Sequence, residues 1–235
     1  MISVRTKLYF STENLILQQF FVFTFPERHD KMCSYLYFSF LRGQTMDSNF
    51  FALISRMRYI ARWGLMRNAL PENIQEHSHM VAVLAHALGV IRRDIFHQPC
   101  DVNALATAAL YHDASEILTG DLPTPIKYHN AEIMSAYHAV EDLAVQKLLG
   151  MLPPELRPSY EHLVLEDDKE LEPFVKGADK LSAYLKCIEE QKAGNTEFDS
   201  AAAMTMQALR DMHREEMDWF LDHCLEPFTR TLDQL

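Results

Sequence analysis

Glycine is scarce in this sequence, with 7 residues among 235, whereas alanine, leucine, methionine and glutamate are frequent. This balance favours helices over a sheet. No apolar run approaches the roughly 18 residues that a membrane span requires, so we expect no membrane partner. The four cysteines, Cys33, Cys100, Cys187 and Cys224, form no CxxC pair. Their spacing excludes a zinc knuckle or a small disulfide framework and indicates a reducing, cytoplasmic setting.

Positive charge is also in deficit. The chain has 22 Lys and Arg against 33 Asp and Glu, which gives a formal net charge of -11. Such a surplus of negative charge opposes extended contact with a nucleic-acid backbone or an anionic membrane, so we expect no nucleic-acid partner. A small anionic ligand would need a local positive centre, either a Lys or Arg side chain or a metal ion.

The first 45 residues differ from the rest. They contain aromatic and β-branched runs and an excess of basic residues, and they have no sustained helical period. Polar residues interrupt the apolar part, so the segment makes a poor signal peptide. We predict that Met46 is the true start and that residues 1–45 are an atypical extension outside the fold. Residues 46–235 then form one domain, long enough to bury a core.

From Met46 onward, hydrophobic residues recur with helical spacing and predict an all-α bundle. Asp47 or Ser48 can cap the first helix, and Asp101 or Asn103 can cap the third. Gly120 is expected to end the third helix because glycine tolerates the left-handed conformation that closes many helices. The expected helices span about 48–60, 71–92, 101–118, 132–149, 155–165, 171–188 and 200–224.

A histidine and two carboxylates lie close together within the third predicted helix. Helical spacing would place His112, Asp113 and Glu116 on the face of Leu105 and Ala109, which points toward the core. Burying an imidazole and a carboxylate is costly unless each has a partner, and a divalent cation between them would satisfy both. The alternative is a packed core histidine beside a solvated aspartate, which is common for a His-Asp pair.

Two further helices direct polar groups inward. His77 lies on the apolar side of the 71–92 helix, and Asp179 lies beside Ala178 on the apolar side of the 171–188 helix. Two imidazole nitrogens and two carboxylate oxygens suit Mn²⁺, Co²⁺, Fe²⁺ or Zn²⁺ and leave positions for water. The candidate ligands are therefore His77, His112, Asp113 and Asp179, although a hydrogen-bonded core histidine remains open for His77.

This H…HD…D order resembles the HD-domain metal-dependent phosphohydrolases, and the surrounding motifs narrow the resemblance. Together they resemble the bacterial 5′-deoxynucleotidases of the YfbR type, over residues 46–235 and over none of residues 1–45. The motifs are Arg62-Trp63, Leu65-Met66-Arg67-Asn68, Glu76-His77-Ser78, Tyr111-His112-Asp113-Ala114-Ser115-Glu116, Thr119-Gly120-Asp121-Leu122-Pro123-Thr124-Pro125 and Ala183-Tyr184-Leu185-Lys186-Cys187.

The resemblance implies a single HD domain that hydrolyses 2′-deoxyribonucleoside 5′-monophosphates to deoxynucleoside and phosphate. It also implies a cytoplasmic homodimer with one divalent metal ion, Co²⁺ or Mn²⁺ first and Zn²⁺, Fe²⁺ or Cu²⁺ as other candidates. The metal ligands would be the four residues of the H…HD…D pattern. Catalytic roles would fall to Glu116, Arg62 and Asp121, and substrate contacts to Arg62, Trp63, His77, His112, Asp121 and Asp179.

The residue types fit this chemistry independently. Phosphate monoesters resist hydrolysis because their charge repels nucleophiles, and a metal ion can neutralise charge and acidify water. Glu116 can orient that water or move its proton, and Arg62 can clamp phosphate with its planar fork. Asp121 can bond the leaving 5′ oxygen or the sugar, or cap the proline-rich loop. Trp63 can pack against C2′ and disfavour a ribose hydroxyl, or it can be a hydrophobic plug.

Two other functions remain open. An HD hydrolase could act on nucleoside triphosphates or guanosine polyphosphates, but such substrates carry more charge and the region shows one clear arginine. A non-catalytic metal-dependent nucleotide sensor would use the same ligands without turnover. Glu116 argues against the sensor because a protein that only binds does not need it.

Overall fold

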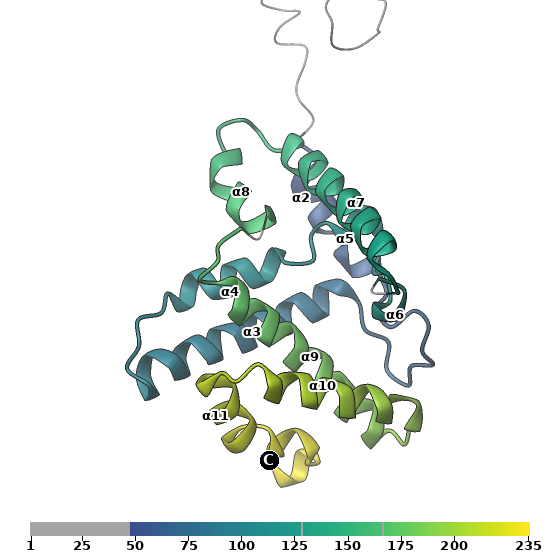
Figure 1. Cartoon of the computed structure of the whole chain (residues 1–235), viewed down its shortest axis with the longest axis vertical. Coiled ribbons are helices and arrows are strands. Elements are labelled where there is room, and N and C mark those ends of the chain that lie inside the picture. Colours follow the sequence, from purple (N-terminus) through teal and green to yellow (C-terminus); the bar gives the residue numbers. More distant parts are fainter. Residues whose placement is uncertain (1–47, 128, 166) are drawn as a thin grey trace, which may run out of the picture. The chain divides into compact units, whose positions relative to one another are not determined.

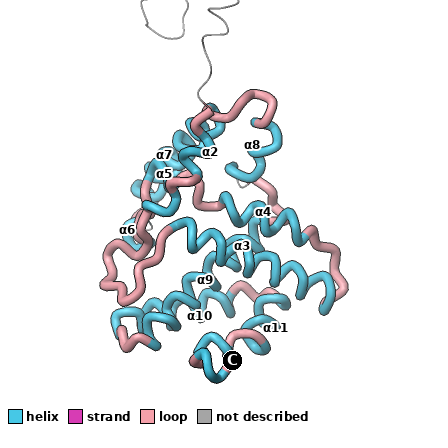
Figure 2. Tube along the Cα trace, turned by 180° about the vertical axis from the view of Figure 1, so that it is seen from behind, coloured by secondary structure: helices cyan, strands magenta, loops and turns pink. Residues whose placement is uncertain are grey.

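The computed structural model describes residues 48–127, 129–165 and 167–235. The predicted extension, the boundary at Met46 and the candidate cap Asp47 lie outside these ranges. Within them the regular elements are helices (Figure 2). An isolated antiparallel bridge pairs Ala61 with Asn73. The predicted all-α class is therefore confirmed. None of the helices described is long and apolar enough to cross a membrane.

The helices follow one another with short connections. Short elements accompany them: the 3₁₀-helices η1 (Met57–Tyr59), η3 (Thr196–Phe198), η4 (Glu226–Thr229) and η5 (Leu232–Gln234), and the π-helix η2 (Ile91–Ile95). The α-helices are α2 (Phe50–Ile54), α3 (Ile74–Val90), α4 (Val102–Tyr111), α5 (Glu116–Thr119), α6 (Thr124–Lys127), α7 (Ala131–Gly150), α8 (Arg157–Leu165), α9 (Glu172–Lys192), α10 (Asp199–Asp211) and α11 (Glu215–His223).

The main core lies where α3, α4 and α9 meet, with α10 and α11 against α9 and α3 (Figure 1). The apolar faces of these helices supply its buried side chains. Helices α3 and α4 approach closely because position 89 has no side chain: a Cβ on Gly89 would lie 2.7 Å from Leu105 Cδ1. The core includes Val81, Leu84, Leu88, Leu105, Leu181, Leu185, Leu209 and Met217.

A second apolar cluster joins α2, α7 and α8. Phe50 is fully buried there, and its ring lies 5.4 Å from that of Tyr160 and 6.4 Å from that of Tyr111. Helix α7 contributes only its C-terminal half. The helical spacing of Ile133, Val140 and Leu148 predicts that all three point inward. This prediction is wrong for the first two, because Ile133 is 36% and Val140 50% exposed, and only the last turns reach the cluster.

Side-chain caps explain where three helices begin. Asn73 accepts from the backbone N–H of Glu76 at the start of α3, and Glu76 returns the contact, which makes a capping box. Asp101 caps α4 by accepting from two backbone N–H groups, and Asn130 caps α7 by accepting from the backbone N–H of Ile133. The predicted starts of these helices, 71, 101 and 132, agree with the structure within three residues.

Three segments predicted as single helices are divided in the structure. Residues 48–60 form α2 and then η1, and Asn49, not Ser48, precedes the first helical residue. Residues 200–224 divide into α10 and α11 at His213, which has a left-handed φ of 49°. The turn brings the buried Glu216 to within 3.3 Å of Arg92 Nη1 in η2, directly after α3. Tertiary contact thus overrides the continuous helical pattern.

The division of residues 101–118 concerns the candidate site directly. Helix α4 ends at Tyr111, and α5 begins at Glu116. His112 Nδ1 lies 2.8 Å from the carbonyl oxygen of Ala109, the group that the N–H of Asp113 would bond if the helix continued. Tighter turns follow, because Glu116 N–H donates to Asp113 O. His112, Asp113 and Glu116 therefore do not share one helical face, contrary to the prediction.

A buried ion pair anchors the loop that follows Trp63. Glu190, fully buried on α9, accepts from Lys186 Nζ at 2.5 Å and from the N–H groups of Ala69 and Leu70 at 2.7 and 3.0 Å. Asn195 Nδ2 adds a contact of 2.7 Å. Burial opposes the charge, but these hydrogen bonds prevail and lower the pKa of Glu190 from 4.5 to about 2.

We predict that Glu190→Gln lowers the free energy of unfolding by about 3 kcal/mol at pH 7. The folded pKa lies below the unfolded value, so the charge stabilises the fold above pH 4.5 and loses this effect as the pH falls toward about 2. Urea denaturation at several pH values measures both effects. Glu189→Gln, an exposed neighbour on α9, is the matched control. An equal loss in both variants, or a loss unchanged at pH 3, would contradict this account.

Candidate metal centre

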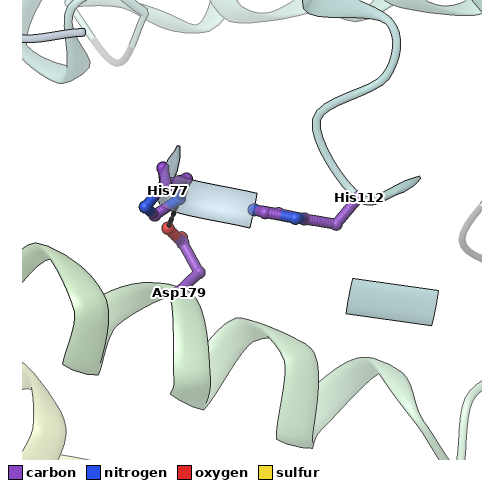
Figure 3. A group of neighbouring side chains, drawn as sticks. All are labelled: His77, His112 and Asp179. Atoms are coloured by element: carbon purple, nitrogen blue, oxygen red, sulfur yellow. Dashed lines mark ion pairs between the residues drawn. The ribbon is translucent and has the colours of Figure 1, made fainter. Parts of the chain in front are cut away.

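His77 and Asp179 approach each other from α3 and α9. Nε2 of His77 lies 3.0 Å from Oδ1 of Asp179, and the two side chains point toward one another in Figure 3. The His77 side chain is fully buried, whereas 41% of the Asp179 side chain is exposed. The pair thus links the core to a surface that a ligand can reach.

His112 and Asp113 reach the same point from the turn after α4. Asp113 Oδ2 lies 3.1 Å from His112 Nε2 and 3.5 Å from His77 Nε2. His112 faces His77 and Asp179 from the opposite side in Figure 3. One ligand atom from each of His77, His112 and Asp179 falls within 4.8 Å of the other two. Two imidazoles and two carboxylates from distant parts of the chain therefore meet in one place.

The hydrogen bonds of the two rings favour a cation at this place. A carbonyl oxygen can only accept, so the contact with Ala109 assigns the proton of a neutral His112 ring to Nδ1 and leaves a lone pair on Nε2. Nδ1 of His77 lies 3.1 Å from Ser182 Oγ, a hydroxyl that can donate or accept, so this contact fixes the ring orientation but not the tautomer. The lone pair on Nε2 of His112 faces a carboxylate oxygen of Asp113, and the two repel each other unless a proton or a metal ion lies between them. The donor set fits a divalent ion.

The carboxylates of the cluster favour their charged forms. Burial alone would raise the pKa of Asp113, but the neighbouring rings of His112 and His77 and the guanidinium of Arg62 hold that pKa well below its usual range. Burial likewise opposes the charge of Asp179, and the contact with His77 lowers its pKa. Negative oxygens are what a hard or borderline cation binds best.

Glu116 lies in the opposite electrostatic situation. Burial, followed by the charges of Asp113 and Asp121, raises the pKa of Glu116 to about 9, while Arg62 acts against the rise. Its Oε2 atom is buried and has no hydrogen-bond partner among the described residues. When the pKa of one carboxyl group is raised and those of its neighbours, here Asp113 and Asp179, are lowered, the arrangement is typical of acid–base sites.

Arg62, Trp63 and Asp121 form the rim of the cluster. The positive charge of Arg62 acts to lower the pKa of Asp113, of Glu116 and of Asp121, so the guanidinium lies near all three carboxyl groups. Burial raises the pKa of Asp121, and Arg62 and the backbone N–H of Trp63 oppose this rise. The proline-rich loop and the segment after η1 are therefore in contact at the site.

Sequence reasoning missed two side chains that hold the site residues. Ser182 lies one turn after Asp179 on α9 and contacts His77, a spacing that could have been noticed. Glu72 accepts from both Arg62 and Trp63, and nothing in the sequence pattern indicated this. Two lysines of the sequence motifs and the adjoining loop, Lys127 and Lys186, pair with Glu141 and Glu190.

Comparison with solved structures supports the fold and the metal. An HD-domain phosphohydrolase from Listeria innocua is 26% identical, with a TM-score of 0.65 over 77% of this chain and 88% of the other. The HD phosphohydrolase DatZ of cyanophage S-2L, bound to dA and one catalytic Zn²⁺ ion, is 25% identical, with a TM-score of 0.53 over 78% and 96%. The chain thus has the HD-domain fold, and its cluster matches a divalent metal site.

Sequence comparison identifies the family. A family model described as 5′-deoxynucleotidase YfbR-like matches residues 49–228. A 5′-deoxynucleotidase of Pectobacterium atrosepticum is 48% identical over 192 residues, which cover 80% of this chain and 96% of the relative. One of Cronobacter sakazakii is 47% identical over 194 residues, with the same coverage. The chain therefore belongs to the YfbR-like 5′-deoxynucleotidase family of HD-domain phosphohydrolases.

Proposed function

We propose that this protein is a metal-dependent 5′-deoxynucleotidase that converts 2′-deoxyribonucleoside 5′-monophosphates to deoxynucleoside and phosphate. The observation that carries the proposal is the meeting of two imidazoles and two carboxylates beside Arg62 and the buried Glu116. Relatives that share almost half of their residues with this chain are named 5′-deoxynucleotidases.

His77, His112, Asp113 and Asp179 are the proposed ligands of one divalent ion. When bound, the ion supplies positive charge that offsets the charge of the phosphate and acidifies water. Co²⁺ and Mn²⁺ are the first candidates for this nitrogen and oxygen set, and Zn²⁺ is supported by the neighbour DatZ. The contacts of the two rings with Ala109 and Ser182 keep each Nε2 directed at the centre.

Arg62 and Asp121 at the rim, together with the buried Glu116, would act on the substrate. Arg62 presents a planar fork that can donate two parallel hydrogen bonds to phosphate oxygens. Glu116 can orient the attacking water. Its raised pKa keeps it protonated at neutral pH, and the charge of a bound cation would favour the carboxylate form, which can take the proton of that water. Asp121, held near the Trp63 backbone, can hydrogen-bond the sugar or the leaving 5′ oxygen.

Trp63 is the proposed determinant of the sugar. Its ring lies 5.2 Å from that of Phe198, so it forms a supported apolar wall next to Arg62. A ribose 2′-hydroxyl packed against this wall would lose its hydration without gaining a partner, whereas the CH₂ of deoxyribose would not. Discrimination of this kind favours deoxyribonucleotides.

We also propose a cytoplasmic homodimer. The described cysteines Cys100, Cys187 and Cys224 are free thiols, in keeping with a reducing compartment. On α7, Val140 is 50% and Leu143 71% exposed, an apolar surface that a second copy could cover. Light scattering on the purified protein at micromolar concentration tests this assembly, and a monomer mass would exclude it.

The proposed activity is tested with a panel of deoxy and ribo mono-, di- and triphosphates in the presence of Co²⁺, Mn²⁺ or Zn²⁺. We expect phosphate release from deoxyribonucleoside monophosphates only, and none after chelation of the metal, because the protein residues alone cannot neutralise the phosphate. Pyrophosphate or tripolyphosphate release would point to a hydrolase of more highly phosphorylated nucleotides. Binding without release would point to a sensor.

Asp113→Ala should abolish metal-dependent turnover and weaken metal binding at least about 100-fold, because it removes the oxygen that lies between the two rings. Calorimetric titration with Mn²⁺ and a phosphate-release assay measure the two effects. Asp142→Ala, at an exposed position on α7, is the control. Near wild-type activity in the Asp113 variant would remove this residue from the ligand set.

Trp63→Ala should reduce the ratio of kcat/KM between deoxy and ribo substrates about tenfold, mainly through better use of the ribonucleotide. Trp219, the other tryptophan, stacks on His223 with ring centroids 4.3 Å apart, outside the candidate site. Trp219→Ala therefore serves as the control and should keep the ratio. If both variants keep it, the selectivity depends on other residues.

A further inference from the structure

One carboxylate oxygen contacts both the arginine and the tryptophan of the rim. Oε2 of Glu72 accepts from Trp63 Nε1 at 2.9 Å and from Arg62 Nη1 at 3.3 Å. The Glu72 side chain is 16% exposed and that of Arg62 13%. Hydrogen bonds to a charged, partly desolvated acceptor are stronger than neutral ones, so this oxygen fixes both partners.

The backbone brings Glu72 to this position. The N–H of Arg62 donates to the carbonyl of Glu72 at 3.0 Å, and the N–H of Ile74 donates to Ile60 at 3.0 Å. Together with the bridge between Ala61 and Asn73, these bonds hold the segment after η1 antiparallel to the entry into α3. Since α3 also carries His77, the rim is aligned with the candidate metal centre through this pairing.

Trp63 needs such support because its backbone is strained. Its φ of 60° lies in the left-handed region, which is costly for a bulky residue. The carbonyl of Trp63 accepts from Met66 N–H at 2.9 Å, and the ring packs on Phe198. These contacts fix the backbone and one side of the indole. The bond from Nε1 to Glu72 fixes its polar edge, and therefore its rotation.

We propose that Glu72 is a positioning residue that joins phosphate binding to sugar selection. This inference rests on the proposed function, in which Arg62 clamps the phosphate and Trp63 forms the wall against the sugar. It assigns the orientation of both side chains to Glu72. A guanidinium has five N–H donors, so the contact through Nη1 leaves others for phosphate. Glu72 does not touch the reacting atoms, and its effect reaches the substrate through Arg62 and Trp63.

The physical contact can be tested without any activity. The sequence has two tryptophans, so an ¹⁵N spectrum contains two indole N–H signals, assigned with Trp219→Phe. In Glu72→Ala we expect the Trp63 indole signal to shift and to exchange faster with water, because its acceptor is gone. The Trp219 signal should stay in place and serves as an internal reference.

The link to selectivity is tested by steady-state kinetics with deoxy and ribo monophosphates. Glu72→Ala should raise KM and reduce the deoxy-to-ribo ratio of kcat/KM roughly tenfold, the loss expected for charged hydrogen bonds. Glu72→Gln keeps an acceptor for Nε1 but loses the charge facing Arg62. It should restore most of the ratio while KM remains raised, a split that general destabilisation would not produce.

Two controls separate positioning from folding. In a Trp63→Phe background, which lacks the indole donor, Glu72→Ala should leave the ratio unchanged. Glu76→Ala removes the capping box at the same end of α3 and should also leave it unchanged. An unmoved Trp63 signal, or an unchanged ratio in an active Glu72→Ala enzyme, overturns the inference. Absence of phosphate release by the wild-type protein instead overturns the proposed function, and the indole signals still decide whether Glu72 holds Trp63.

Discussion

The site depends on an electrostatic conflict that only a positive charge between its members relieves. Nε2 of His77 and Nε2 of His112 both face carboxylate oxygens at about hydrogen-bond distance, while the contact of His112 Nδ1 with a carbonyl leaves its Nε2 as an acceptor. Acceptors gathered around one point repel each other. The surrounding core can hold this arrangement because α3 and α9 contribute buried side chains to the same apolar cluster, and separating the two helices would expose them.

The same constraint explains the unexpected break in the third predicted helix. By taking the Ala109 carbonyl with its ring, His112 ends α4 and redirects the chain into tighter turns. Asp113 then faces the two imidazoles, and Glu116 opens a new helix near Asp121. A continuous helix would have spread these side chains along one face. The local loss of helical hydrogen bonding thus brings the side chains of His112, Asp113 and Glu116 to one site.

The sequence predicted the helical class, most helix starts and the order of the candidate ligands, because periodicity and capping residues are local signals. It failed where distant contacts decide. The division at His213 follows from the meeting of Glu216 with Arg92, and the exposed start of α7 follows from how few elements cover it. The role of Glu72 could not be predicted, because its contacts with Arg62 and Trp63 depend on the antiparallel pairing before α3. This pairing produces no periodic pattern in the sequence.

The segment from Arg62 to Leu70 has neither helix nor sheet to hold it, and its order comes from two buried or nearly buried carboxylates. Glu72 binds the side chains at its start, and Glu190 binds the backbone N–H groups of Ala69 and Leu70 at its end. Glu72 lies just before α3, which carries His77, and Glu190 lies on α9, which carries Asp179. The loop is thus fixed at both ends beside the two helices that carry candidate metal ligands. The proposed selectivity for the sugar would therefore depend on these anchors as well as on the loop itself.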